Sequence, residues 1–396
     1  MTPAARTTEG VARAAYGRLV AMLAARTRDI AAAEDALADA FAAALATWPL
    51  RGIPERPEAW LMATAKNRLT DAARRASRAP VEPVSDLPEV EAMIADPDTI
   101  PDDRLRLMFA CAHPAIAPDL RAPLMLQCVL GLDAARIARA WAVPQAAMAQ
   151  RLVRAKAKIC DAGIGFVLPG LSDMPARLPP VLEAIYGAYA GAWMDPDGAD
   201  LSDEALWLAR LVPDLLPEVA EAQGLAALIA LSRARSPARV KDGALVPLSE
   251  QDTALWDGVL LAEGASRLAT AYRLRQPGRF QIEAAIEEVH CHRRVTGQTD
   301  WPAVLTLTEA LLAGWPTLGA EVNRAVALAE VQGAAAGLAA LPDVEGFQPA
   351  LAARAHFLLA LRHEAEAVQA LDATLALTPQ GPSRRYLLAL RAAVGH

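Results

Sequence analysis

The chain has 396 residues, 54% of them hydrophobic and 21% charged, and its formal net charge is −7. This length allows two or three domains with substantial cores, and the abundance of Ala and Leu predicts an all-α fold. The sequence contains no uncharged apolar run of about 18 residues, and its first residues lack the apolar core of a signal peptide. We therefore expect a protein of the cytoplasm with no membrane partner.

Two long helices rich in Ala and Leu are predicted near the N-terminus, over residues 11–26 and 29–48. Asp29 stands at the expected N-cap of the second helix, because its side chain can accept hydrogen bonds from the first free backbone amides. The second helix also carries three acidic residues, at positions 34, 35 and 39, beside apolar side chains. It therefore combines an acidic surface with an apolar one.

A third helix is predicted over residues 58–75. Polar and basic side chains gather in its C-terminal half: Lys66, Asn67, Arg68, Arg74 and Arg75. Cations near a helix C-terminus commonly compensate the helix dipole, which is one interpretation of this run. The run extends over about two and a half turns, however, whereas the dipole effect is confined to the last turn. A surface that follows the phosphates of a nucleic acid fits this spread better.

Basic and acidic residues are segregated along the chain. Residues 51–78 hold seven basic and three acidic side chains, whereas residues 80–103 hold eight acidic side chains and none that is basic. The second stretch is also rich in Pro, which predicts a linker. Residues 1–165 carry a net charge of +2 and the remainder −9. An acidic chain thus contains a basic N-terminal part that is compatible with nucleic-acid binding.

Two helical patterns between Leu120 and Ile159 are joined by a short Val-Pro break. From Ala134 to Ile159 there are six Arg or Lys side chains and no Asp or Glu. Pro144 suits the first turn of a new helix, where its missing N–H has no partner to lose. This arrangement is typical of a helix-turn-helix whose second helix enters a DNA groove. An ordinary surface helix with a solvated basic face is the alternative interpretation.

The second of these helices begins at Gln145. Its predicted apolar face consists of Met148, Leu152, Ala155 and Ile159. Side chains near the N-terminal end of such a helix reach base edges, and basic side chains further along meet phosphates. We predict base contacts from Gln145 and Gln150, and phosphate contacts from Arg151, Arg154 and Lys156.

The remainder of the chain, from about residue 177, is predicted to consist of helix pairs. Residues 301–315 pair with 320–332, and residues 349–361 pair with 363–377, with small residues where helices approach closely. Such pairs are typical of tetratricopeptide-like arrays, which present a groove for proteins or peptides. We expect this acidic part either to restrain the basic regions or to recruit an activating partner.

Signals for metal binding and catalysis are weak. His290, Cys291 and His292 follow Glu287 and Glu288, but adjacent positions on a helix point in different directions, so structural or surface roles are preferred. The four cysteines show no paired or metal-type spacing and are expected to be reduced. No catalytic triad, phosphate loop or paired-carboxylate cleft stands out. We expect no enzymatic activity, no metal and no cofactor.

Several blocks together resemble a known family. EDALADAFAAALATW and RPEAWLMATAKNRLTDAARR, followed by the acidic linker and the helix-turn-helix, resemble an RNA polymerase sigma factor of the extracytoplasmic-function class. Further blocks, among them LRLMFACAHPAIAPDLRAPL, RLPPVLEAIYGAYA and VPLSEQDTALWD, resemble the subgroup with a long C-terminal tetratricopeptide-like extension. The resemblance implies region 2 at residues 1–79, a linker at 80–103, region 4 at 104–165 and the extension at 166–396.

The resemblance also implies roles for individual residues. Docking on the polymerase core is implied for Glu34, Asp35, Leu37, Asp39, Phe41 and Trp48. Ordinary core packing is the alternative for Leu37, Phe41 and Trp48. Recognition of the minus-10 element is implied for Lys66, Asn67, Arg68, Arg74 and Arg75, with capture of a single-stranded base near residues 51–56. The minus-35 helix corresponds to Gln145, Ala147, Ala149, Gln150, Arg151 and Arg154, with Lys156 as a further phosphate contact. Ala at two of these positions favours contact with thymine methyl groups or recognition of DNA shape.

The implied function is that of an alternative sigma factor, which directs the RNA polymerase core to promoter DNA for transcription initiation. Its extension would modulate that activity or bind a protein or peptide partner. Two other functions stay open from the residues alone. One is a repressor that uses only the helix-turn-helix, and the other is a helical ligand or metal sensor without initiation activity. Binding of the polymerase core separates them, because neither a repressor nor a sensor needs it.

Overall fold

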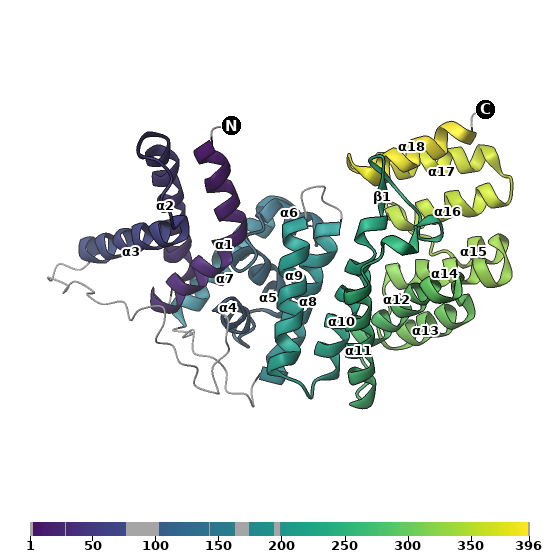
Figure 1. Cartoon of the computed structure of the whole chain (residues 1–396), viewed down its shortest axis with the longest axis horizontal. Coiled ribbons are helices and arrows are strands. Elements are labelled where there is room, and N and C mark those ends of the chain that lie inside the picture. Colours follow the sequence, from purple (N-terminus) through teal and green to yellow (C-terminus); the bar gives the residue numbers. More distant parts are fainter. Residues whose placement is uncertain are drawn as a thin grey trace. The chain divides into compact units, whose positions relative to one another are not determined.

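The structure is a computed structural model that describes residues 3–27, 29–76, 103–141, 143–162, 174–193 and 199–394. Within these residues, α-helices account for nearly all regular structure, and two short strands form one hairpin (Figure 1). The prediction of an all-α fold is therefore confirmed. None of the described helices is long and apolar enough to cross a membrane. The chain divides into two compact units, which we call unit 1 (residues 1–191) and unit 2 (residues 192–396).

Unit 1 consists of two groups of helices and the greater part of a further helix. The first group is α1 (Pro3–Thr27), α2 (Ile30–Arg51) and α3 (Pro57–Ala76). The second group is α4 (Asp103–Cys111), α5 (Pro118–Cys128), α6 (Ala134–Ala140) and α7 (Gln145–Asp161), and α8 (Met174–Trp193) follows. The predicted helices at residues 11–26, 29–48 and 58–75 are thus confirmed, although α1 begins earlier than predicted, at Pro3, and α2 ends later, at Arg51.

Local chemistry explains where α2 begins and ends. The side chain of Asp29 accepts a hydrogen bond from the backbone N–H of Ala32 at 3.0 Å, which confirms the predicted N-cap. At the other end the helix continues past Trp48 through Pro49, and Gly52 ends it with a φ of +86°. That left-handed conformation is readily adopted only by glycine.

The core of unit 1 joins both groups of helices. Helices α1, α2 and α3 pack against one another, α5 packs on both α6 and α7, and α1 and α2 also contact the second group. Leu23 and Leu37 are fully buried in this core. The rings of Trp48 and Trp60 meet edge to face, with centroids 5.6 Å apart, and tie α2 to α3.

Unit 2 begins with helices that surround α10 and continues with a run of shorter helices. Its first helices are α9 (Ala199–Leu215), α10 (Ala220–Ala234), α11 (Gly258–Arg273) and α12 (Arg279–Thr296). The later ones are α13 (Trp301–Gly314), α14 (Leu318–Gln332), α15 (Ala334–Ala340), α16 (Gln348–Ala360), α17 (Glu364–Leu377) and α18 (Pro382–Val394). Strands β1 (Val240–Lys241) and β2 (Ala244–Leu245) pair antiparallel, with Val240 opposite Leu245.

Helix α10 lies at the centre of unit 2. All of its residues except Glu221 and Arg233 are buried, because α9, α11 and α12 pack around it. A helix that is apolar on every side is stable only when neighbouring helices cover all its faces. The side chain of Glu221 accepts hydrogen bonds from the backbone N–H groups of Phe280 and Gln281 at the start of α12. It thereby satisfies amides that the helix itself leaves free.

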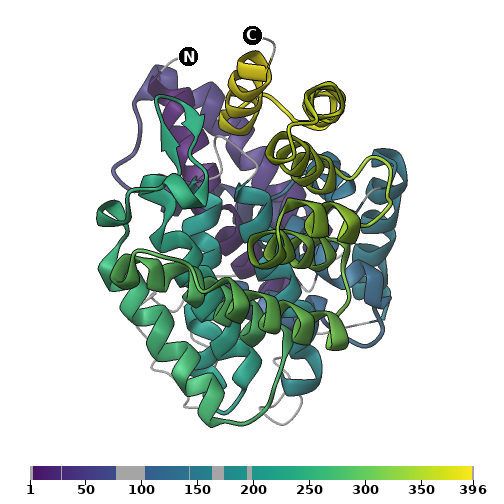
Figure 2. The ribbon, with the colours of Figure 1, turned by 90° about the vertical axis from the view of Figure 1, so that its right-hand side faces the viewer.

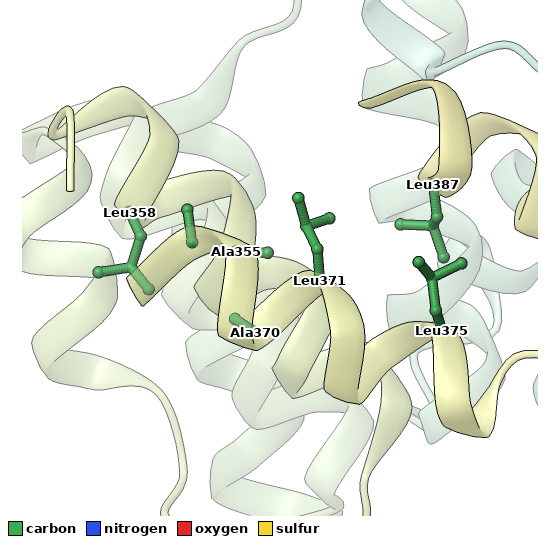
Figure 3. Packing of buried hydrophobic residues seen from close by; sticks show 7 residues of the cluster. Ala355, Leu358, Ala370, Leu371, Leu375 and Leu387 are labelled. Carbon is green, nitrogen blue, oxygen red and sulfur yellow. The ribbon is translucent and has the colours of Figure 1, made fainter. Parts of the chain in front are cut away.

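The C-terminal half of unit 2 is a succession of helices in which each packs against the next, from α12 to α18 (Figure 2). The predicted helix pairs at residues 301–332 and 349–377 correspond to α13 with α14 and α16 with α17. Figure 3 shows one of the small cores between them, where Leu371 and Leu375 of α17 lie near Leu387 of α18. Leu358 of α16 belongs to the same buried cluster.

Candidate nucleic-acid interface

Helix α7 has one buried face and one exposed face. Its buried residues are Met148, Leu152, Ala155 and Ile159, as predicted. Of the residues predicted to contact DNA, Gln145, Gln150, Arg151 and Arg154 are exposed, whereas Ala147 and Ala149 are partly buried. Helix α6, which precedes it, is capped by Asp133, whose carboxylate accepts a 2.7 Å hydrogen bond from the N–H of Arg136. Helices α5 and α6 thus pack against α7, whose polar face is open to solvent.

Among the described residues, the exposed arginines of α7 have only weak partners. Arg151 Nη1 lies 4.0 Å from Asp119 Oδ2, and both side chains are well exposed. Arg154 Nε donates to the backbone carbonyl of Gln150 at 3.3 Å. Exposed ion pairs of this kind contribute about 0–1 kcal/mol, so an incoming phosphate can replace the protein partner. Arg151 can therefore exchange the Asp119 carboxylate for a phosphate, and Arg154 can exchange a neutral carbonyl for one.

Lys156 is placed differently from the other basic residues of α7. Its Nζ lies 2.6 Å from Glu34 Oε2 on α2, and the two side chains are only 11% and 14% exposed. The structure therefore brings together one residue predicted to contact DNA and one predicted to contact the polymerase. In this arrangement each is occupied by the other.

The exposed surface of α3 carries most of its predicted basic set. Asn67, Arg68 and Arg74 are exposed, and Lys66 is partly buried. Burial lowers the pKa of Lys66, with a further contribution from the positive charge of Arg26. The side chain of Arg75 lies outside the described residues. The described members of the set thus extend along the helix rather than forming a single cap at its end.

The acidic helix α2 divides the predicted polymerase set into surface and core. Leu37 and Trp48 are 0% and 3% exposed and pack in the core, so they act on any partner only by holding the helix in place. Phe41 is partly buried. Asp35 and Asp39 are exposed and can meet a partner directly. Within the predicted polymerase set, the side chains that are exposed to a partner are therefore those of Asp35 and Asp39.

Large apolar residues of α2 and of the segment that follows it are also exposed. Leu45, Leu50 and Ile53 are 50%, 86% and 41% exposed. Leu50 lies about three helical turns after Asp39, so the two side chains share a face of α2. Exposed large apolar side chains beside polar ones are typical of a protein-binding surface. Their exposure could have been predicted from the sequence, because these residues fall outside the apolar stripe that faces the core.

The histidine-rich segment of α12 does not form a shared site. The ring of His290 packs edge to face on Trp301 with centroids 5.4 Å apart, and its pKa is lowered by burial. Cys291 is buried, which raises the pKa of its thiol to about 12, and His292 is exposed. In the part of the chain that the structure describes, no three His, Cys, Asp or Glu side chains are placed to hold a metal ion.

Comparison with known proteins places two segments of the chain in families. Residues 11–79 match the model of sigma-70 region 2, and residues 177–272 match a family of unknown function, DUF6596. An uncharacterized protein of Rhizobium meliloti (strain 1021) is 37% identical over 377 residues, which cover 91% of this chain and 89% of that protein. No solved structure matches the chain.

The three helices α1 to α3 therefore form a sigma-70 region 2, the part of a sigma factor with which RNA polymerase recognises promoters. Region 2 supports a sigma-70 family sigma factor, and over nearly its whole length the chain belongs to the same family as the Rhizobium meliloti protein. A sigma-70 region 2 implies the RNA polymerase core and promoter DNA as partners. Sigma-70 proteins are transcription factors without enzymatic activity.

Proposed function

We propose that the chain is a sigma factor of the extracytoplasmic-function class in which α4 to α7 act as region 4. The observation that carries the proposal is the exposed face of α7, where Gln150, Arg151 and Arg154 are open to solvent on a helix that closely follows α6 and comes after region 2 in the chain. A polar helix face with glutamine and arginine supplies both base and phosphate contacts. In this proposal α7 contacts the minus-35 element of the promoter.

The surfaces of α2 and α3 take the other two roles. Asp35, Asp39 and the exposed Leu50 of α2 form the proposed docking surface for the polymerase core. Asn67, Arg68 and Arg74 of α3 lie on the proposed minus-10 surface. Two separate, weak DNA contacts become effective when one polymerase holds both, because the second contact then forms at high local concentration.

The proposed domain organisation follows the sequence: region 2 at residues 1–79, a linker at 80–103, region 4 at 104–165 and an extension at 166–396. The extension is proposed to be tetratricopeptide-like, which is supported by its successive packed helix pairs. Its acidic character suits modulation of the basic promoter-binding parts or recruitment of a protein or peptide partner.

Two substitutions on α7 test the minus-35 assignment. Promoters are first found by mapping the 5′ ends of transcripts induced on overexpression, and binding of each variant with core polymerase is then measured on a library of minus-35 sequences. Gln150→Ala is expected to change sequence preference at one or two positions. Arg151→Ala is expected to weaken binding to all sequences alike and to reduce the salt slope by about 1. A shift in preference alone for both variants contradicts the assignment.

A substitution on α2 tests docking on the polymerase. Leu50→Asp places a charge on an 86% exposed side chain and is expected to weaken binding of the core by about tenfold or more, since interface centres tolerate charge poorly. Val295→Asp is the matched control, because Val295 is 80% exposed on α12 in unit 2 and is expected to leave binding unchanged. Failure of the unaltered protein to bind the core favours a repressor or sensor instead.

A further inference from the structure

The succession of helices in the C-terminal half of unit 2 returns to its start. In arrays of helical repeats each unit contacts its neighbours, so the two ends of an array do not touch. Helices α12 to α18 pack on their neighbours in this way, but α18 also contacts β2, where Gly243 and Arg385 meet although they are 142 positions apart in the chain. Figures 1 and 2 both show the hairpin of β1 and β2 beside α18. The contacts therefore form a closed circuit, from α10 through α12 to α18 and back through the hairpin.

The contact that closes this circuit lies at the surface. Arg385 Nη1 donates a 2.9 Å hydrogen bond to the backbone carbonyl of Gly243, and Arg385 is exposed. Asp242 and Gly243 form the turn of the hairpin, with φ values of +52° and +76°. Because Gly243 has no side chain, the guanidinium lies directly on the turn, where an added Cβ would overlap it. An exposed hydrogen bond stabilises a contact only weakly, since water competes for both groups.

The base of the hairpin is fixed to α10 and α12. Arg239 precedes β1, and its guanidinium donates 3.0 Å hydrogen bonds to the carbonyl and the hydroxyl of Ser232 on α10. Arg293 of α12 donates to the carbonyls of Leu248 and Ser249, which follow β2. The hairpin therefore moves with α10 and α12, whereas α18 moves with α17, on which it packs.

The position of α18 relative to the hairpin depends on the curvature of the whole array. Helices α13 to α17 lie between α12 and α18 in the chain. Small rotations between successive units add up along such an array and set its curvature. The contact between α18 and the hairpin is therefore more sensitive to a change of curvature than any contact between neighbouring helices.

We propose that Gly243 and Arg385 form a clasp, which holds the helical array of unit 2 in a closed, curved conformation and releases α18 when the array straightens. The inference goes beyond the proposed function, because it concerns unit 2 alone and requires neither polymerase nor DNA. A clasp of this strength leaves the closed and open forms in equilibrium. A partner that fits one form better shifts the equilibrium toward that form.

Two substitutions release the clasp by different means. Arg385→Ala removes the hydrogen-bond donor, and Arg354→Ala, at an exposed arginine of α16, is its control. Gly243→Ala places a methyl group where the guanidinium lies, so Arg385 must move away. Gly346→Ala is the matched control, because Gly346 has the same φ of +76° but no atom within 4 Å of an added Cβ. The two alanines share the strain of the left-handed region and differ in the contact with Arg385.

The distance between the hairpin and α18 is measured by electron paramagnetic resonance on the full chain with two spin labels. Cysteines that carry the labels replace Lys241 and Ala389, both exposed, and Cys160→Ser removes the exposed native thiol, the other three cysteines being buried. Arg385→Ala and Gly243→Ala are each expected to raise the ratio of the longer to the shorter distance about 2–10-fold, as the loss of one hydrogen bond predicts. Both control variants are expected to match the unaltered protein.

Two outcomes overturn the proposal. Equal distance distributions in all variants show that the contact does not control the position of α18. An equal change in Gly243→Ala and Gly346→Ala, with none in Arg385→Ala, assigns the effect to backbone strain. Urea unfolding shows which variants fold, and Arg385→Ala decides the matter if Gly243→Ala does not fold, because its position is exposed. Failure of the unaltered protein to bind core polymerase would overturn the proposed function and leave this inference intact.

Discussion

Glu287→Gln is a direct test of what holds the centre of unit 2 together. Glu287 on α12 forms an ion pair with Arg235, which follows α10, and the two side chains are 23% and 6% exposed. The Nε of Arg235 is buried and has no hydrogen-bond partner in the part of the chain that the structure describes, so the guanidinium depends on this carboxylate. Glutamine keeps the shape of the side chain but removes its charge. The substitution therefore leaves a buried cation without its counter-charge.

The expected loss of stability follows from this burial. Removing one partner of a buried ion pair costs about 3–5 kcal/mol, and the partial exposure of Glu287 lowers the expectation to about 2–4 kcal/mol. For a unit of some 200 residues each kcal/mol shifts the melting temperature by about 2–4 °C, so we expect a decrease of roughly 5–15 °C. Asp372→Asn is the control, because Asp372 pairs with Arg391 at an exposed position and should lose less than about 1 kcal/mol.

Urea denaturation and calorimetry of the full chain measure the effect, and a double-mutant cycle with Arg235→Met isolates the pair. Met removes the buried cation, so adding Glu287→Gln to it should cost much less than adding it to the unaltered protein. We expect a coupling of about 1–3 kcal/mol. A loss below about 0.5 kcal/mol for Glu287→Gln alone, or additive effects in the cycle, would refute the reasoning.

Two further predictions concern unit 2. Leu371→Ala removes a fully buried side chain from the cluster of α16 to α18 and should lower the free energy of unfolding by about 3–4 kcal/mol, measured by urea denaturation; a loss under 1 kcal/mol contradicts close packing there. The pKa of Glu263 is held below its ordinary value near 4.5, chiefly by hydrogen bonds from Arg210. A carboxyl group whose pKa is lower in the folded state stabilises the fold at pH values above its unfolded pKa, and this stabilisation is lost as the pH falls through the folded pKa. The difference in urea midpoint between the unaltered protein and Glu263→Gln should therefore be largest near pH 7 and should decrease as the pH falls below about 4.5. A difference that is independent of pH contradicts this.

Local features of the fold could be predicted from the sequence because their signals lie within a few residues. Asp29 caps α2, Pro144 precedes α7, and the four apolar residues of α7 share its buried face, all as expected. The division of α2 was harder to predict, since Leu37, Phe41 and Trp48 fit both a core and a docking surface. Their burial follows from where α1 and α3 lie, which helical periodicity alone does not state.

Contacts between distant segments could not be predicted. Helical periodicity places Lys156 beside the buried face of α7 and Arg154 on the opposite side, but it does not identify Glu34 as the partner of Lys156. The pairing of Lys156 depends on the contact of α2 with α7, two helices that lie on either side of the acidic segment in the sequence. Exposed apolar residues such as Leu50 were also missed, because the search began from charge and motif spacing rather than from residues outside the core stripe.

The burial of α10 has a consequence for the synthesis of the protein. Its covering helices α11 and α12 follow it in the chain, and α12 ends about 60 residues after α10. At about 5–20 residues per second, the ribosome needs roughly 3–12 s to complete them. Throughout that interval this apolar helix lacks two of the three helices that will cover it, since only α9 precedes it in the chain. We therefore expect the nascent chain to engage a chaperone at residues 220–234, and ribosome-bound chains that end before and after α12 to differ in that binding.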